Sequence, residues 1–195
     1  DLMLINTKSI DEAVLPNKKT NVVIAAFVTA QARLKLYSLL EKLGRRVLYF
    51  DTDSIIYTCR PGEQPLPCAD FLGDLTDEVA PYGHGSFISE FIGAGPKSYA
   101  YKICVGGDIY NTKTVCKIRG ITLNHRTSKV VNFDSLKKAV VEDFGPLHVH
   151  MPHKIVRQPE WKVITRAEDK IYRVVYTKRR RLPDSYDTLP KKKKK

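Results

Sequence analysis

Two aspartates, Asp51 and Asp53, lie two residues apart in the string YFDTDS of residues 49–54. Apolar, aromatic and β-branched residues flank them on both sides. Turns favour aspartate because its side chain hydrogen-bonds to nearby backbone groups. Rigidly held carboxylates are also the ligands that Mg²⁺ takes, together with substrate phosphates, in phosphoryl or nucleotidyl transfer. These residues alone leave both an ordinary turn and a metal-dependent transfer site open.

The elements that would position these carboxylates are a hairpin and a helix. Residues 47–57 predict two short strands joined by a turn at Thr52 and Asp53. Apolar residues at three- and four-residue spacing predict an amphipathic helix over residues 21–43, capped by the Thr20 hydroxyl. Gly44 would end that helix.

The middle of the chain predicts short elements between turns. A loop rich in proline is expected over residues 60–69, followed by a helix over residues 70–79. Three strands are then expected, over residues 86–92, 97–105 and 112–118. Mixed helices and strands without strict alternation predict an α+β fold.

The C-terminal third predicts one helix and a hairpin. The helix would be capped at Asp134 and run to Phe144. The hairpin would contain three strand segments and a turn over residues 167–170. These segments are residues 154–156, 161–166 and 171–178.

Composition narrows the class of protein. The 195 residues are 43% hydrophobic, which is enough for a core, and no run reaches the length of about 18 apolar residues that crosses a bilayer. We therefore expect a soluble protein with no membrane partner. Four cysteines without a CxxC pair indicate reduced thiols in the nucleus or cytoplasm, not a secreted disulfide framework.

Positive charge is concentrated at the C-terminus. The formal net charge is +12, and residues 178–195 contain nine basic residues against two acidic ones. Such a segment predicts a disordered basic tail. Its basic residues suit nucleic-acid contact or nuclear import, while a solvated terminus or an expression artefact is the plainer interpretation.

The string YFDTDS resembles the YxDTDS motif of family B DNA polymerases, which forms a hairpin of the palm. The preceding helix and two later segments, GPKSY at 95–99 and CKIRGI at 116–121, resemble the protein-primed subgroup of that family. That subgroup serves viruses, linear plasmids and DNA transposons of the Maverick/Polinton kind. The resemblance covers roughly residues 15–182. It implies an antiparallel palm sheet with a long packing helix over residues 1–121, a small thumb over 122–177 and a basic tail over 178–195.

The resemblance also implies roles for individual residues. Asp53 matches the principal metal ligand and Asp51 its partner, and both would be catalytic in a mechanism that uses two Mg²⁺ ions. The positions that aim these carboxylates are Tyr49, Thr52 and Ser54. The positions that contact DNA are Lys97, Tyr99, Lys117 and Arg119. The implied partners are primer-template DNA, dNTPs and a terminal protein primer.

Several motifs of the complete enzyme do not occur in this sequence. The strand motif DxxSLYP, which carries the other catalytic aspartate, is missing, and so are the nucleotide-binding motif Kx3NSxYG and the exonuclease acids. We therefore expect a C-terminal part of a DNA-directed DNA polymerase that is inactive alone. The alternative is a non-catalytic, basic nucleic-acid-binding remnant of a mobile-element polymerase.

Two other features have plain interpretations. The histidines of HVHMPH, which are His148, His150 and His153, are expected to lie in a loop and to be exposed rather than to bind a metal. Trp161 is expected to pack inside the thumb.

Overall fold

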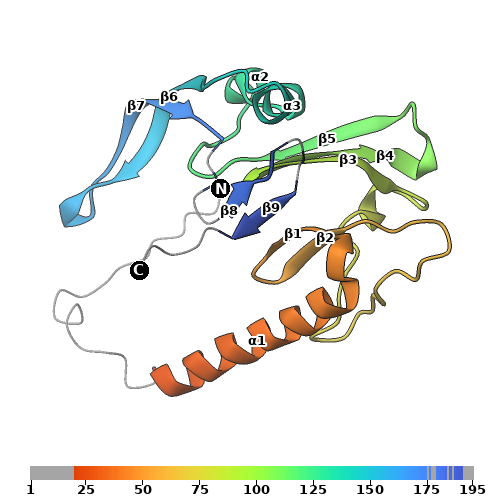
Figure 1. Cartoon of the computed structure of the whole chain (residues 1–195). Coiled ribbons are helices and arrows are strands. Elements are labelled where there is room, and N and C mark those ends of the chain that lie inside the picture. Colours follow the sequence, from red (N-terminus) through yellow and green to blue (C-terminus); the bar gives the residue numbers. More distant parts are fainter. Residues whose placement is uncertain (1–19, 175, 177–178, 184, 186, 191–195) are drawn as a thin grey trace. The chain divides into compact units, whose positions relative to one another are not determined.

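The computed structural model describes residues 20–174, 176, 179–183, 185 and 187–190. The chain divides into two compact units, Asp1–Tyr57 and Thr58–Lys195, and each is described by itself. The α+β class is confirmed, with helices and small antiparallel sheets in the order shown in Figure 1. The predicted boundary at residue 121 stays a prediction.

Helix α1 of the first unit spans Val22–Leu43, close to the predicted range. Its N-terminal cap is Asn21 and not Thr20, because the Asn21 side chain accepts a hydrogen bond from the Ile24 amide at 3.0 Å. Gly44 ends the helix with φ of +54°, as predicted, since glycine adopts this conformation without steric cost.

Most apolar side chains of α1 are exposed. Leu36 and Leu43 are buried, whereas Val23 and Phe27 are more than half exposed. Within Val22–Arg46 an 18-residue window has a mean hydropathy of 1.3, so this helix is long and apolar enough, by length and composition alone, to cross a membrane. Core helices of soluble proteins and signal sequences meet the same criterion, so the expectation of a soluble protein stays a prediction. The packing of this helix against a palm sheet stays a prediction.

The predicted hairpin is confirmed. Strand β1 spans Val47–Asp51 and pairs in antiparallel fashion with β2, Ser54–Tyr57, across a two-residue turn. The register shifts between Val47 and Tyr49. The Arg46 guanidinium lies over the Tyr57 ring, 5.4 Å from its centroid.

The second unit begins with irregular chain in place of the helix predicted over 70–79. Gly73 has φ of +93°, and the Asp74 carboxylate accepts a hydrogen bond from the Phe71 amide at 3.1 Å. A local turn of this kind competes with helix formation. The segment ends in a 3₁₀ turn, η3, at Ala80–Tyr82.

A three-stranded antiparallel sheet forms the centre of the second unit. Its strands are β3 (Phe87–Gly95), β4 (Ser98–Cys104) and β5 (Thr112–Lys117), in the order β3-β4-β5. The 3₁₀ turn η4, Val105–Gly107, lies in the β4–β5 connection. All three predicted strands are confirmed, although β3 extends further through the glycine-containing segment.

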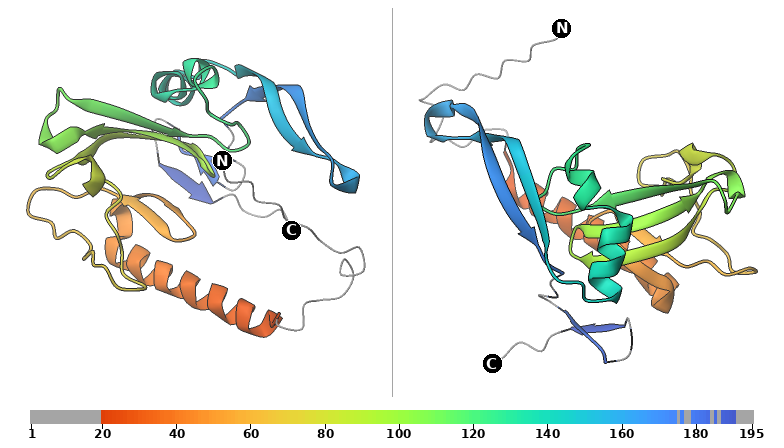
Figure 2. Two further views of the ribbon diagram at one scale, coloured as in Figure 1. Left: turned by 180° about the vertical axis from the view of Figure 1, so that it is seen from behind. Right: turned by 90° about the horizontal axis from the view of Figure 1, so that it is seen from above.

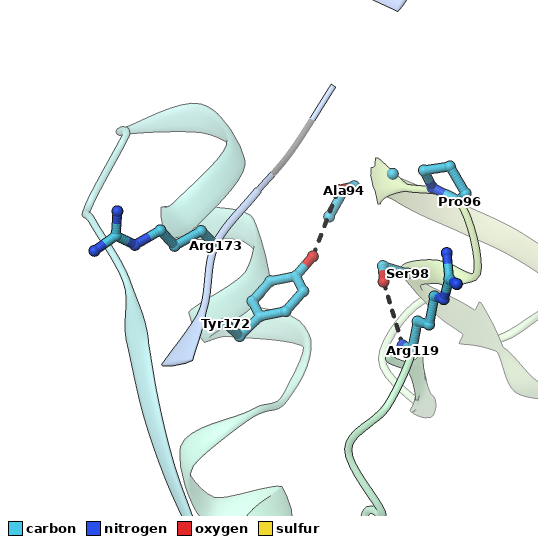
Figure 3. A pocket seen from close by; sticks show the side chains of 7 residues that line it. Ala94, Pro96, Ser98, Arg119, Tyr172 and Arg173 are labelled. Atoms are coloured by element: carbon cyan, nitrogen blue, oxygen red, sulfur yellow. Dashed lines mark hydrogen bonds between the residues drawn. The ribbon is translucent and has the colours of Figure 1, made fainter. Parts of the chain in front are cut away.

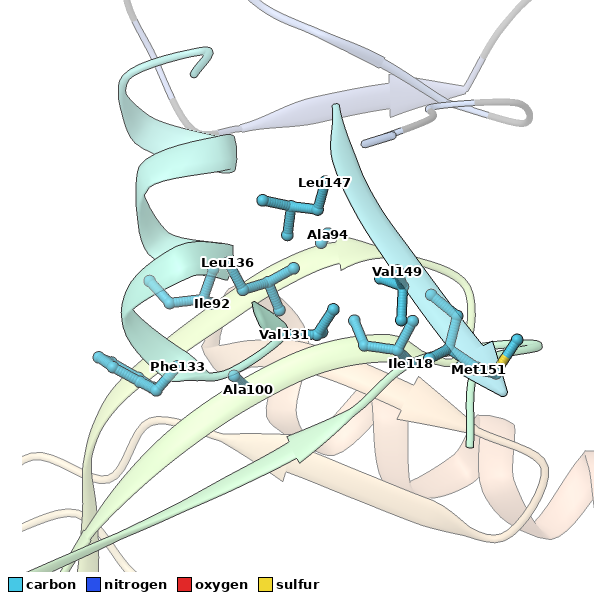
Figure 4. Close-up of a cluster of buried hydrophobic side chains, with 11 residues drawn as sticks. Ile92, Ala94, Ala100, Ile118, Val131, Phe133, Leu136, Leu147, Val149 and Met151 are labelled. Atoms are coloured by element: carbon cyan, nitrogen blue, oxygen red, sulfur yellow. The ribbon is translucent and has the colours of Figure 1, made fainter. Parts of the chain in front are cut away.

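Helices and strand β6 cover one face of this sheet. Helix α2 spans Thr127–Val130 and α3 spans Phe133–Val141. Figures 1 and 2 show both helices over the sheet. The buried side chains come from the sheet, the helices and β6 (Figure 4). They are Ile92, Ala94, Ala100, Ile118, Ile121, Val131, Phe133, Leu136, Leu147, Val149 and Met151.

The last long hairpin differs from the prediction. Strand β6 spans Leu147–Arg157 and pairs with β7, Val163–Tyr172, across the 3₁₀ turn η5, Pro159–Trp161. Residues 167–170 therefore lie inside a strand and form no turn. Trp161 is 78% exposed, so the predicted packing inside a thumb is wrong.

The histidines of HVHMPH lie within β6, so the predicted loop is wrong. His148, His150 and His153 are exposed, as expected. The alternating neighbours Val149 and Met151 are buried, which is the period of a strand with one face on the core. The four cysteines are free, as predicted.

The basic tail is partly regular. Strands β8 (Arg179–Arg181) and β9 (Thr188–Pro190) pair in antiparallel fashion. The prediction of disorder therefore does not hold for these residues, because the Arg179 side chain donates hydrogen bonds to Thr188 across the pair. The polylysine stretch lies outside the described residues.

The N-terminal cap of α3 is Asn132, where the sequence predicted Asp134. Asn132 and Ser135 exchange hydrogen bonds of 3.0 Å in each direction, which is a capping box. Asn132→Ala should lower the free energy of unfolding by about 1 kcal/mol, as measured in urea. The control Asp134→Asn keeps both capping bonds and should have a smaller effect. Equal losses would contradict this assignment.

Candidate active site and nucleic-acid interface

The two aspartates lie at the end of the β1–β2 hairpin. Asp51 is the last residue of β1 and pairs with Ser54, the first of β2. The Asp51 carbonyl accepts hydrogen bonds from the Asp53 amide at 2.5 Å and from the Ser54 hydroxyl at 3.2 Å. The Thr52 hydroxyl lies 3.2 Å from Asp51 Oδ1 and donates to it. Thr52 therefore bonds to the Asp51 carboxylate and Ser54 to its backbone carbonyl, while a role of these residues in aiming a catalytic carboxylate stays a prediction.

The turn is held in a strained conformation. Thr52 has φ of +50°, which β-branched residues rarely adopt. Such a residue costs about 1–3 kcal/mol and persists only where the surrounding structure fixes it. Here the fixing elements are the paired strands, with Phe50 opposite Ile55 and Asp51 opposite Ser54. Tyr49 lies two residues before Asp51 and shares its face of the strand, because side chains alternate with a period of two.

A cation held by the two carboxylates, and completed by water and phosphate oxygens, stays a prediction. Asp53 is exposed, and its carboxylate has no hydrogen bond or ion pair within the described part of the chain. Mg²⁺ commonly takes one or two carboxylates of this kind. Among the described residues there is no cluster of three or more His, Cys, Asp or Glu side chains that could hold a metal.

The predicted DNA-contact residues lie in the second unit. Lys97 is the second residue of the β3–β4 turn, where Gly95 pairs with Ser98, and it has φ of +56°. Tyr99 follows in β4 and is half-buried. Like Thr52, Lys97 is a non-glycine residue in a left-handed conformation at the end of a hairpin.

Tyr99 and Lys117 come together on the sheet face opposite the core. They are direct partners of the β4–β5 register, and the Lys117 ammonium lies 5.8 Å from the Tyr99 ring centroid. Tyr101 stacks on Tyr99 with centroids 6.2 Å apart, and Phe91 lies 6.1 Å from Tyr99. A Cβ added at Gly93 would lie 3.3 Å from the Phe91 ring, so this ring covers Gly93. The four side chains form the aromatic-basic face of the sheet.

The charge of Lys117 is stabilised on this face. Burial disfavours the ammonium, but the hydrogen bond with the Tyr99 hydroxyl and the electrostatic effect of Tyr99 and Tyr101 outweigh it, so the pKa of Lys117 is raised. Burial also raises the pKa of Tyr101. The Lys117 ammonium therefore lies beside an aromatic platform, an arrangement that suits a phosphate next to a base.

Arg119 lies elsewhere, past the end of β5. Its amide donates to the Ser98 hydroxyl at 3.3 Å, and its side chain extends toward the β3–β4 turn (Figure 3). It lines a shallow pocket of about 200 Å³ together with Tyr172. The Tyr172 hydroxyl donates to the Ala94 carbonyl at 3.5 Å, and burial raises the pKa of Tyr172 to about 12.

Two members of the aromatic-basic face were not predicted from the sequence. Phe91 and Tyr101 belong to it by strand pairing, since they oppose each other across β3 and β4. Alternation within each predicted strand could have placed Tyr101 on the side of Tyr99. Phe91 needed the register, which a bulge between Ile88 and Glu90 alters.

Comparison with models of protein families gave no match. Comparisons with curated proteins and with solved structures gave none either. The comparisons assign this chain to no family, so the function must be inferred from its residues.

Thr52→Gly should raise the free energy of unfolding by about 1 kcal/mol, because glycine adopts positive φ without strain. Urea unfolding of the 195-residue chain measures this change. The matched control is Thr114→Gly, at an exposed position within β5, where glycine should destabilise the strand. If both substitutions destabilise the protein equally, Thr52 is not strained.

Proposed function

We propose that this chain is the C-terminal palm and thumb part of a DNA-directed DNA polymerase of family B, of the protein-primed subgroup. The observation that carries the proposal is the strained hairpin end that displays Asp51 and Asp53 in the string YFDTDS. Strain of this kind clusters at functional sites, where the surrounding structure fixes it, although Asp143, Glu160 and Trp161 also have positive φ in this chain.

The two aspartates would have different tasks. Asp53, exposed and without a partner in the described part of the chain, would be the principal ligand of Mg²⁺. Asp51, which accepts the Thr52 hydroxyl, would complete the ligand set and keep a fixed orientation. Bound Mg²⁺ would supply charge stabilisation for the primer 3′ oxygen and the pyrophosphate leaving group. The protein's own contribution would be positioning and charge.

The DNA-contact residues would hold primer-template DNA. Lys117 presents a fixed cation to a phosphate, and Tyr99 presents a ring and a hydroxyl beside it. Lys97 and Arg119 would add contacts on either side of the β3–β4 turn. The other partners in this proposal are dNTPs and a terminal protein primer, in the nucleus or cytoplasm.

A non-catalytic nucleic-acid-binding protein is the second candidate. The aromatic-basic face favours it, since stacking and phosphate contact need no metal. The two candidate functions differ in the role of Asp53, which would bind a metal only in the polymerase. Both give Lys117 the same role, a contact with phosphate.

Lys117→Gln should weaken binding of a primer-template duplex severalfold and lower the slope of log affinity against log salt by about one, because one phosphate contact is lost. Fluorescence anisotropy across a salt series measures both. The control Lys138→Gln removes the same charge from an exposed position on α3. Equal effects of the two substitutions would show that only net charge matters.

Asp53→Asn should abolish primer extension with Mg²⁺ in a polymerase that joins this chain to the missing DxxSLYP and Kx3NSxYG segments. DNA binding in a gel shift should stay nearly intact, because the substitution keeps the shape of the side chain and removes a charge needed only for the metal. Asp70→Asn, at an exposed position of the second unit, is the control.

Loss of extension and of binding together would assign Asp53 a structural role instead. The 195 residues alone should give no templated extension. Clear extension by this chain alone would contradict the proposal that it is an incomplete catalytic part.

A further inference from the structure

A larger pocket, of about 570 Å³, lies between the loop of residues 122–126 and the middle of β6. Its histidine and basic side chains come from two segments, with His125 and Arg126 on the loop and His153 and Lys154 on the strand. The volume is within the range of small-ligand sites. No residue of this pocket belongs to the site proposed above.

The pocket lies where β6 departs from regular pairing. The register with β7 shifts between Met151 and Lys154, at Pro152, which has no amide hydrogen to donate to a ladder. The bulge leaves His153 exposed, and Ile155 is 72% exposed. The strand therefore contributes apolar surface, from Pro152 and Ile155, on either side of an imidazole.

The facing loop is held by a buried threonine. The Thr127 hydroxyl donates to the Thr122 carbonyl at 2.8 Å and accepts from the Asn124 amide at 2.8 Å. Asn124 Oδ1 accepts from the amides of Arg126 and Thr127 at 3.0 and 3.1 Å. His125 and Arg126 therefore extend from a fixed backbone, which lowers the entropy that a ligand must overcome.

The pocket carries positive charge that the protein does not neutralise. Within the described part of the chain, the side chains of His125, Arg126 and His153 have no hydrogen bond or ion pair. The nearby carboxylate, Glu168, is bound by Lys154 and lies 3.7 Å from Lys170. Because Glu168 already interacts with Lys154 and Lys170, it does not neutralise the charge of Arg126.

We propose that this pocket binds an unpaired nucleotide of a single-stranded nucleic acid. Arg126 contacts its phosphate, and its base packs against Pro152, Ile155 and the His153 imidazole. Planar imidazole and guanidinium groups beside apolar surface favour a base over a simple anion, because bases stack on such planes. That the single-stranded nucleic acid is a polymerase substrate rests on the proposed function. Binding of a nucleotide in this pocket does not depend on that function.

Anisotropy of a short labelled oligo(dT) with the 195-residue chain tests the proposal. Arg126→Gln should weaken binding about tenfold, and His153→Ala should weaken it severalfold. The controls are Arg157→Gln and His148→Ala, at exposed positions of the same strand outside the pocket, and they should leave affinity nearly unchanged. Unchanged thermal unfolding of each variant excludes loss of folding as the cause.

Competition identifies the ligand. Thymidine monophosphate should displace the oligonucleotide at lower concentration than inorganic phosphate, and a blunt duplex should compete poorly. Equal losses in Arg126→Gln and Arg157→Gln would overturn the proposal, as would equal competition by phosphate or by duplex. These outcomes leave the tests of Asp53 and Lys117 untouched, so failure here is distinguishable from failure of the polymerase proposal.

Discussion

The pairing of β4 with both its neighbours is the constraint on which the second unit depends. Ala100 has no exposed surface and contacts the core, whereas Tyr99 and Tyr101 on either side of it point to the opposite face. A register slip of one residue would exchange these faces and expose the core. The register that buries Ala100 also pairs Lys117 with Tyr99. Burial of Ala100 therefore fixes the distance between the Lys117 ammonium and the Tyr99 ring. Core packing therefore positions the residues that we propose to contact nucleic acid.

Two of the hairpin turns with a non-glycine residue at positive φ carry candidate functional residues, and the β6–β7 turn, with Glu160 and Trp161, is a third that carries none. Thr52 and Lys97 each have positive φ in a two-residue turn, and glycine occupies neither position. Paired strands on both sides fix the conformation of each turn. The hydrogen bonds of these strands therefore offset the free-energy cost of the positive φ. A site held this way loses less entropy when it binds a ligand than one on a free loop.

Local sequence patterns predicted those strands, turns and helix ends that depend on neighbouring residues in the chain. The β1–β2 hairpin, its turn and the three central strands follow from alternation and turn residues, and Gly44 ends α1 as expected. The helix over residues 70–79 failed because a glycine and an aspartate make a turn there. Strand β7 runs through residues 167–170, where Glu168 pairs with Met151 and its carboxylate forms an ion pair with Lys154, and no local rule contains either contact.

The candidate site likewise combines residues that local sequence predicts with residues that only long-range contacts bring together. Asp51 and Asp53 follow from their spacing, while Phe91 and the residues around Thr127 become site elements only through pairing and loop closure. Charge illustrates why this matters. The basic tail accounts for much of the net +12, yet a cation fixed by neighbours, as Lys117 is by Tyr99, would specify where a phosphate sits in the proposed complex. A charge that no neighbour holds in place would add affinity for nucleic acid that falls as the salt concentration rises. The position of the bound nucleic acid would depend on the packed residues.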